Sequence, residues 1–405
     1  MNKITYFRKQ IYESSTSGNW AEAAESGEAL LAEYRYSEPL GGFGISYADD
    51  LFNLARAYDE LGMTDKASSL YMDSANRVFF MLGISREFAC RLNNLAVLMS
   101  KTGRLVLARH LYGQVLTVLN FISDTENREI ADALYNAANA AADMNQYDEA
   151  VKLHKEALEI RLSNSVNQDI VNSLHSLAFI HEGKKDYAQA IKYASDAMSF
   201  AKKMEDTGDT FFRACYYLAC LYDNENMHQH ARPLYEMTLK WIEKKESRGH
   251  SAYVTVGMKL AYVLTSLDAC DDALLLMNDI REMLEKTLHG DFLCYAGCLK
   301  NLAHLHRQLG VSEQSIPLLL KSIHIRKRVM GVYANDNILP DIMTLLAQYM
   351  DGGQVCEAAD MLVYLLMCSN TAQLSKAVPE LSRIFVKSGH EKFNTLLSEL
   401  EKLSD

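Results

Sequence analysis

The sequence LYNAANAAADMNQYDEAVKLH, residues 134–154, holds two alanines twelve positions apart, Ala138 and Ala150. Between them lies Asn145, a residue type that tolerates the left-handed backbone in which many helices end. Two antiparallel helices approach closely only where neither carries a bulky side chain at the crossing. We therefore predict a helix, a tight turn and a second helix packed against the first at the two alanines.

The same pattern recurs along the chain, with 40 to 42 residues between successive copies. The first alanines of the copies are Ala55, Ala96, Ala138, Ala178, Ala219, Ala261 and Ala303. The small residues twelve positions later are Ala67, Ala108, Ala150, Ala190, Ala231, Ala273 and Ser315. A larger side chain at such a crossing would overpack it, at about 1–3 kcal/mol. The regular spacing predicts a repeat array in which each unit packs only on its neighbours.

Two further rows of residues follow the same period. The turn position, seven residues after the first alanine, holds Gly62, Gly103, Asn145, Lys185, Asn226, Asp268 and Gly310. Lys185 is the exception, and we expect Gly183 to provide the turn in that repeat. A bulky residue usually follows the second small residue by four positions, at Tyr71, Tyr112, His154, Tyr235, Met277 and Leu319, whereas Ala194 breaks this rule. We expect this row to fill the space between successive hairpins.

Partial copies at both ends extend the array. We expect a single solenoid over residues 1–403 with about nine repeats. The expected repeats are 4–37, 46–80, 86–121, 129–163, 169–204, 210–244, 252–287, 294–329 and 338–368, followed by a capping hairpin at 372–403.

Composition limits the classes of function. The net charge of −11 argues against a nucleic-acid binder, which needs a basic face to neutralise phosphates. The first 20 residues contain no apolar run of signal-peptide length, and nowhere do 18 apolar residues follow one another, so neither a signal peptide nor a membrane span is expected. The eight cysteines are scattered, as is usual for reduced thiols packed in helices. Together these features predict a cytoplasmic protein.

The repeat resembles the tetratricopeptide repeat. Both have the order Asn-Leu-Ala, then Gly or Asn, then Ala, then Tyr or Leu. The period exceeds the common 34 residues and is similar to that of kinesin light chains. The sequences NLARAYDELG (53–62), ALEIR (157–161), ARPLY (231–235) and KNLAHLHRQLG (300–310) carry this similarity. The resemblance implies an all-α, right-handed solenoid of stacked helix–turn–helix hairpins. We find no long heptad segment ahead of the repeats, so we carry over the architecture and not attachment to a motor.

The resemblance also implies that a peptide or protein binds the concave face, which the first helix of each repeat lines. The candidate residues on this face are Asp132, Tyr135, Asn139, Asp143, His175, Phe179, Glu182, Arg213, Tyr216, Asp223, Met258 and Tyr262. Because many of them are aromatic or acidic, we expect a ligand with Lys or Arg beside an apolar anchor. The alternative is that they are ordinary solvated residues.

A basic cluster between residues 300 and 330 contains Lys300, Arg307, Lys321, Arg326, Lys327 and Arg328, against one acid, Glu313. Two interpretations of this cluster stay open. It could meet an acidic partner or the acidic part of a second copy of the chain. It could equally be a solvated helix end whose cations favour the helix dipole.

Sequence motifs of catalysis are missing. The chain has no Gly-x-Ser-x-Gly elbow and no His-Glu-x-x-His, and the glycine-rich residues 39–44 lack the Lys-Ser/Thr of a phosphate loop. Cys294, Cys298, His304 and His306 have a spacing that matches no zinc finger. We therefore expect a scaffold or adaptor without enzymatic activity, metal or cofactor. The alternative is an intracellular regulator of the kind found in bacteria, in which a bound peptide changes the pitch of the superhelix.

Overall fold

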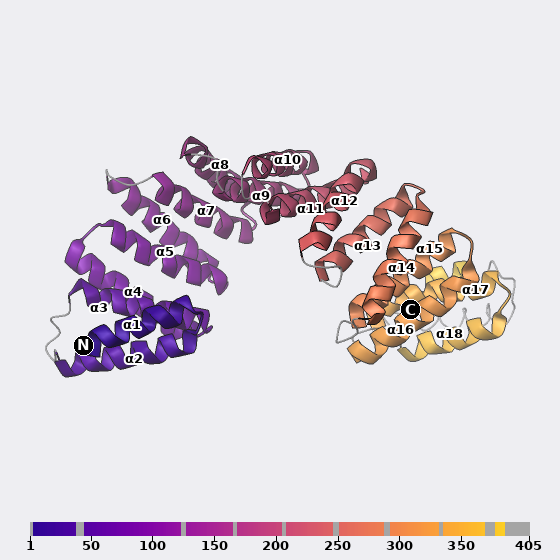
Figure 1. The fold of residues 1–405 in the computed structure, drawn as a ribbon, viewed down its shortest axis with the longest axis horizontal. Coiled ribbons are helices and arrows are strands. Elements are labelled where there is room, and N and C mark those ends of the chain that lie inside the picture. Colours follow the sequence, from indigo (N-terminus) through magenta and orange to yellow (C-terminus); the bar gives the residue numbers. More distant parts are fainter. Residues whose placement is uncertain are drawn as a thin grey trace. The chain divides into compact units, whose positions relative to one another are not determined.

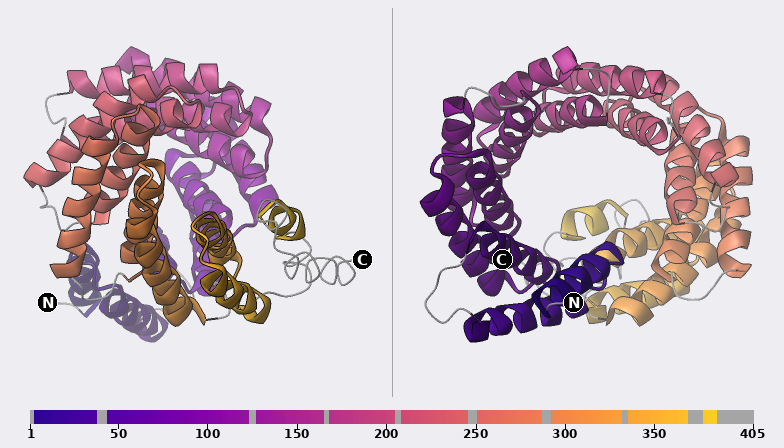
Figure 2. Two further views of the ribbon diagram at one scale, coloured as in Figure 1. Left: turned by 90° about the vertical axis from the view of Figure 1, so that its right-hand side faces the viewer. Right: turned by 60° about the vertical axis from the view of Figure 1, so that its left-hand side comes forward.

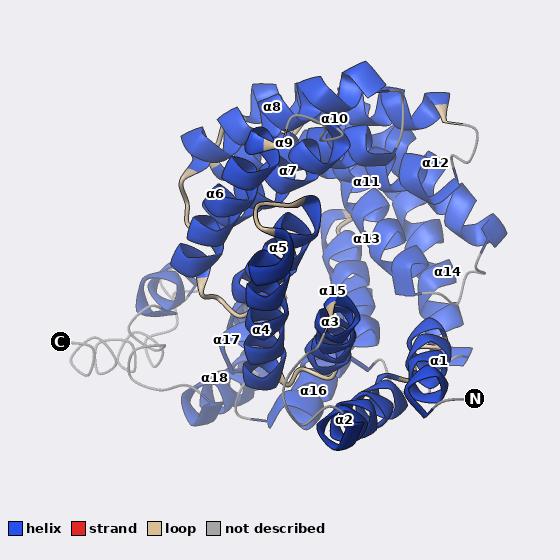
Figure 3. Cartoon of the chain, turned by 90° about the vertical axis from the view of Figure 1, so that its left-hand side faces the viewer, coloured by secondary structure: helices blue, strands red, loops and turns tan. Residues whose placement is uncertain are grey.

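The structure is a computed structural model, which describes residues 3–37, 44–122, 127–164, 168–204, 208–245, 251–286, 292–331, 335–368 and 377–384. Every regular element in these ranges is a helix, and none of them contains a strand (Figures 1 and 3). The chain divides into two compact units, Met1–Ala214 and Cys215–Asp405, which we describe separately.

The first unit contains ten helices within the described ranges and the start of an eleventh. They are α1 (Lys3–Thr16), α2 (Trp20–Ser37), α3 (Ile45–Glu60), α4 (Thr64–Leu82), α5 (Arg86–Lys101), α6 (Leu105–Phe121), α7 (Asn127–Asp143), α8 (Tyr147–Asn164), α9 (Gln168–Gly183) and α10 (Tyr187–Lys203). Helix α11 (Gly208–Asn224) begins in this unit and ends in the second.

The described part of the second unit continues with seven helices. They are α12 (His228–Lys245), α13 (Ser251–Ser266), α14 (Cys270–Lys286), α15 (Phe292–Gln308), α16 (Ser312–Met330), α17 (Asn335–Asp351) and α18 (Val355–Cys368). Residues 377–384 are also helical, while the rest of the expected capping hairpin at 372–403 lies outside the described residues.

Within each unit the helices pack in series, as antiparallel pairs such as α7 with α8 and α15 with α16 (Figure 2). First helices of neighbouring repeats also contact each other directly, α5 with α7, α7 with α9, and α13 with α15. The predicted fold class, an all-α helical solenoid, is confirmed. The single nine-repeat array over residues 1–403 stays a prediction.

The rows of small and bulky residues are buried as predicted. All seven first alanines and all seven small residues twelve positions later expose at most 2% of their surface. The bulky row is also buried, from Tyr71 in the second repeat to Leu319 in the eighth, and Ala194 occupies its position in the fifth. The methyl-to-methyl crossings therefore let each hairpin close, and the larger side chains fill the space behind them.

The turns have one geometry. Asn145 has a φ of 59°, its N–H donates to the carbonyl of Ala142 (2.8 Å), and the N–H of Gln146 donates to that of Ala141 (2.9 Å). This is the bonding of a Schellman motif, which requires a left-handed residue after the helix.

In the fifth repeat, Lys185 itself takes this conformation, with a φ of 60°. Gly183 is the last residue of α9. The expectation that Gly183 would provide the turn was therefore wrong. The length of the turn is set by the hairpin, and the residue at the seventh position must adopt a positive φ whatever its type.

Polar contacts one repeat apart tie neighbouring first helices together in the first unit. Ser176 Oγ donates to the hydroxyl of Tyr135 (3.2 Å), and Arg86 Nε lies 2.6 Å from Glu129 Oε1. These contacts link equivalent stretches of successive repeats, so they hold the first helices side by side. The side chains that α7 and α9 expose therefore lie on one continuous surface.

Candidate functional site

The predicted site residues of the first unit lie on two adjacent first helices, α7 and α9, and at the start of α11. We call the residues on α7 and α9 the α7–α9 surface, defined as Asp132, Tyr135, Asn139, Asp143, His175, Phe179 and Glu182. Phe179 exposes 67% of its surface, and Asp143 is also exposed. The other five are half-buried. The surface is thus a half-buried polar and aromatic floor that carries one strongly exposed ring.

Arg161 of helix α8 is the centre of this floor. Its Nη2 lies 2.7 Å from Asp132 Oδ1, and its guanidinium carbon lies 4.6 Å from the centre of the Tyr135 ring. The structure therefore brings Asp132 and Tyr135 together through a residue that was not among the predicted site residues. Arg161 belongs to the ALEIR motif (157–161), which indicated the type of repeat but not this contact. Since Arg161 exposes 7% of its side chain, it compensates the charge of Asp132 from beneath.

The remaining residues of the first unit are less tightly held. Asp143 forms no ion pair with any described residue. Partial burial, and then the charge of Arg213, lowers the pKa of His175, so this imidazole is neutral at pH 7. Because the charge of Arg213 acts on His175, this exposed residue of α11 lies near the part of the surface that α9 forms. A basic ligand would accordingly meet Asp143 as an unpaired acid.

A small hollow of about 150 Å³ adjoins Asp132, between α5, α6 and α7. Its polar lining includes Cys90, Asn93 and the Arg86–Glu129 ion pair. Cys90 is exposed, but the protein around its thiol desolvates it and raises its pKa, so the thiol stays protonated and is a poor nucleophile. This hollow can therefore accept a small polar group but offers no activated nucleophile.

The predicted residues of the second unit, Tyr216, Asp223, Met258 and Tyr262, do not form one exposed patch. Asp223 exposes only 6% of its side chain, and its carboxylate lies 3.3 Å from His228 Nδ1 and 3.8 Å from Lys259 Nζ. Its charge therefore already has partners. Tyr216 and Met258 are half-buried against the core of this unit. Tyr262 exposes 56% of its surface and meets the ring of His228 edge-on, with centroids 5.9 Å apart.

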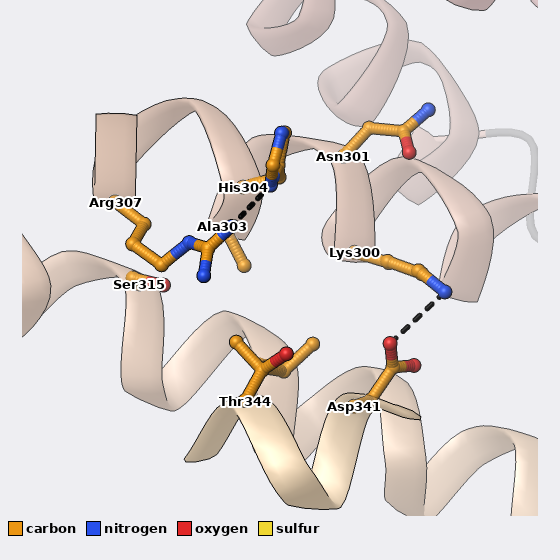
Figure 4. A pocket seen from close by; sticks show the side chains of 9 residues that line it. Lys300, Asn301, Ala303, His304, Arg307, Ser315, Asp341 and Thr344 are labelled. Atoms are coloured by element: carbon orange, nitrogen blue, oxygen red, sulfur yellow. Dashed lines mark hydrogen bonds and ion pairs between the residues drawn. The ribbon is translucent and has the colours of Figure 1, made fainter. Parts of the chain in front are cut away.

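A second hollow lies between α15, α16 and α17 of the second unit, and we call it the eighth-repeat hollow (Figure 4). Its volume is about 260 Å³. Its lining residues are Lys300, Asn301, Ala303, His304, Arg307, Ser315, Leu319, Asp341 and Thr344. Lys300 Nζ is paired with Asp341 Oδ1 at 2.9 Å, and Arg307 Nη2 lies 3.2 Å from His304 Nδ1. Only Lys300 and Arg307 of these residues belong to the basic cluster noted in the sequence.

Metal-binding geometry is not found in the described part of the chain, where no three His, Cys, Asp or Glu side chains gather around a point. Burial raises the pKa of Cys298 to about 12, so this thiol also stays protonated. No helix among the described residues is long and apolar enough to cross a membrane.

Comparison with known families gives two matches, both to models of the tetratricopeptide repeat, at residues 87–163 and 296–337. No curated protein matches the sequence. The two matched segments coincide with the third and fourth repeats and with the eighth, which are built on the pairs of small residues described above.

Several solved structures align with this chain. The apo form of RapI aligns with a TM-score of 0.58 at 13% identity, over 90% of this chain and 96% of that one. The apo quorum sensor NprR from B. thuringiensis gives 0.48 at 16% identity, over 80% and 86%. Repeats of a putative kinesin light chain from Podosopora anserina give 0.44 at 19% identity, over 49% and 96%. At such identities the likeness to RapI concerns the fold alone.

The family matches, the helix pairs in series and the shared turn geometry all describe the same repeat. On these grounds the chain contains tetratricopeptide repeats, at residues 87–163 and 296–337, within a series of helix pairs.

Proposed function

We propose that this protein is a non-enzymatic scaffold that binds a peptide, or an extended segment of another protein, along the α7–α9 surface. The observation that carries the proposal is Phe179, which exposes 67% of its surface on a first helix. Burying such a ring is worth about 1.5–3 kcal/mol. An aromatic side chain left in water on the face where neighbouring first helices meet is therefore a natural anchor for a partner.

The neighbours of Phe179 suit this role because they are fixed in place. Tyr135 is held between the guanidinium of Arg161 and the hydroxyl of Ser176. Its ring also meets His154 edge-on, with centroids 5.1 Å apart. A ligand would lose little free energy in ordering such a surface, and rigid aromatic residues give large contact areas at low entropic cost.

The charges favour a ligand that carries one cation near its apolar group. Asp143 lies at the C-terminal end of α7, and Glu182 lies near the same end of the adjacent first helix α9. Asp143 is exposed and without an ion pair among the described residues. Asp132 contributes less, because Arg161 already compensates it. We therefore expect an apolar or aromatic side chain against Phe179 and a Lys or Arg that reaches Asp143.

The test is calorimetric titration with short, acetylated and amidated peptides in which Arg or Lys stands beside Trp, Phe or Leu. For the tightest peptide, Phe179→Ala should weaken binding about 30-fold, the loss typical of a hot-spot residue. Phe80→Ala is the matched control, because Phe80 is 90% exposed but lies on the second helix α4. Asp143→Asn should weaken binding more at low salt than at high salt.

Binding that is unchanged by Phe179→Ala, or equally weakened by Phe80→Ala, would refute the α7–α9 surface as the site. The alternative function, a regulator that responds to a peptide, uses the same binding step. Small-angle scattering with and without the bound peptide separates the two, since a scaffold keeps its radius of gyration and a regulator changes it.

A further inference from the structure

Helix α15 carries Lys300, His304 and Arg307 on one face, with the spacing i, i+4 and i+7. They lie three residues before, one residue after and four residues after Ala303, the first alanine of this repeat. In the fifth repeat the same positions hold His175, Phe179 and Glu182. The eighth repeat therefore presents three nitrogen-bearing side chains, where the fifth presents an imidazole, a phenyl ring and a carboxylate, and its three side chains line one hollow (Figure 4).

The contact between Arg307 and His304 determines the state of the imidazole. A guanidinium has five N–H donors and no acceptor, so Arg307 Nη2 can only donate to His304 Nδ1 across their 3.2 Å separation. Nδ1 must then carry a lone pair, and the proton of neutral His304 sits on Nε2. Partial burial, together with the charges of Arg307 and Lys300, lowers the pKa of His304 in agreement with this state.

Among the residues that line the hollow, the one acid, Asp341, already forms ion pairs with two cations. Asp341 exposes 5% of its side chain, and its two oxygens face Lys300 Nζ and the guanidinium of Arg326. Arg307 has no carboxylate partner among the described residues, although its side chain is directed into the hollow beside Ser315 and Thr344 (Figure 4). The hollow thus contains a guanidinium that has no carboxylate partner, next to a neutral histidine that can accept a proton.

We propose that the eighth-repeat hollow binds a carboxylate, which is held by Arg307 and His304 and comes from an acidic side chain or the C-terminus of a peptide. Arg is the residue best suited to hold a planar carboxylate with two parallel N–H donors. The volume of about 260 Å³ fits one side chain or a chain end, since sites for drug-sized ligands begin at about 300 Å³.

Binding of the carboxylate is coupled to protonation of His304. The anion offsets the repulsion of Lys300 and Arg307, so it raises the pKa of His304 in the complex. Asp341 faces the same hollow, and its two oxygens are paired with Lys300 and Arg326. Affinity should accordingly increase as pH falls from 8 to 6, while Asp and Glu carboxylates of the ligand stay ionised.

Three blocked tripeptides test the proposal on the full-length protein, followed by NMR of the histidine ring signals. Acetyl-Ala-Glu-Ala-amide carries a side-chain carboxylate, acetyl-Ala-Gln-Ala with a free C-terminus carries a terminal one, and acetyl-Ala-Gln-Ala-amide carries none. One or both acids should shift the His304 signal, which is assigned by its loss in His304→Gln, and the uncharged peptide should not. Which acid binds more tightly identifies the source of the carboxylate.

Exposed Arg307 can be changed without disturbing the core, and Arg307→Gln should weaken binding about 10-fold or more. Arg328→Gln is the control, because it removes the same charge from α16 but lies outside the hollow. His304→Gln should retain binding and lose its dependence on pH. Equal binding of the uncharged peptide, or equal losses in Arg307→Gln and Arg328→Gln, would overturn the proposal. Neither result would affect the α7–α9 surface, which uses other residues and another class of ligand.

Discussion

Arg161 Nη2 lies 2.7 Å from Asp132 Oδ1, an ion pair in which the cation is almost buried and the acid is half exposed, with side-chain exposures of 7% and 48%. The same guanidinium donates to Ser173 Oγ (2.6 Å) and to the carbonyl of Asp169 (3.0 Å). One side chain of α8 thus joins the first helix of its own repeat to that of the next. It fixes the relative placement of α7 and α9, on which the proposed binding surface depends.

The two ends of this ion pair should not be equivalent in mutagenesis. Asp132→Ala leaves an almost buried cation without its acid and should cost about 2–3 kcal/mol, less than for a fully buried pair because Asp132 is half exposed. Arg161→Met removes the charge and leaves an acid that water can reach, so the loss should be smaller, about 1 kcal/mol. Urea unfolding followed by circular dichroism measures both. A larger loss in Arg161→Met would show that packing of the long side chain, and not its charge, dominates.

The arginine also shows where sequence reasoning reached its limit. The alanine pairs predicted the hairpins, because the crossing distance depends on local residue size alone. The partners of a long side chain depend on where the next repeat places its helices, so the ALEIR motif gave no indication that Arg161 lies beneath Asp132. Asp223 was expected to face a ligand, but Lys259 lies 3.8 Å from its carboxylate. Lys259 belongs to the following repeat, so the sequence alone did not predict this partner either.

Lys185 offers a stabilising substitution. It is exposed, and its φ of 60° costs an L residue other than Asn or Gly about 1 kcal/mol. Lys185→Asn and Lys185→Gly should raise the free energy of unfolding by up to about 1 kcal/mol, which appears as a higher urea midpoint. The gain is smaller for glycine, because glycine also gives the unfolded chain more conformational freedom. Gly103→Ala is the converse control, because a Cβ there meets no atom within 4 Å and only the backbone conformation is strained. A lower midpoint for both Lys185 variants would contradict the strain.

The alanine crossings predict a penalty for added size. Ala150 is fully buried where α8 packs on α7, so Ala150→Leu should destabilise the protein by about 1–3 kcal/mol through overpacking. Ala188→Leu is the control, since Ala188 is exposed on the second helix α10 and should change stability by less than about 0.5 kcal/mol. Thermal unfolding compares the two. Similar losses for both would mean that the crossing has room for a larger side chain.

His154 should make stability depend on pH. It is fully buried in the row of bulky residues, neither ring nitrogen has a hydrogen-bond partner among the described residues, and burial followed by the charge of Arg161 lowers its pKa to about 4. Between about pH 6.5 and pH 4 the unfolded chain therefore binds a proton that the folded chain does not, so stability falls with decreasing pH, by about 3 kcal/mol over the whole window. His154→Tyr, which installs the residue found at this position in three other repeats, should remove that part of the slope. Urea midpoints at pH 5 and pH 7.5 measure it, and above pH 7.5 the two proteins should show parallel curves because the imidazole is neutral in both states. Parallel curves down to pH 5 would mean that His154 gains its proton without unfolding the repeat.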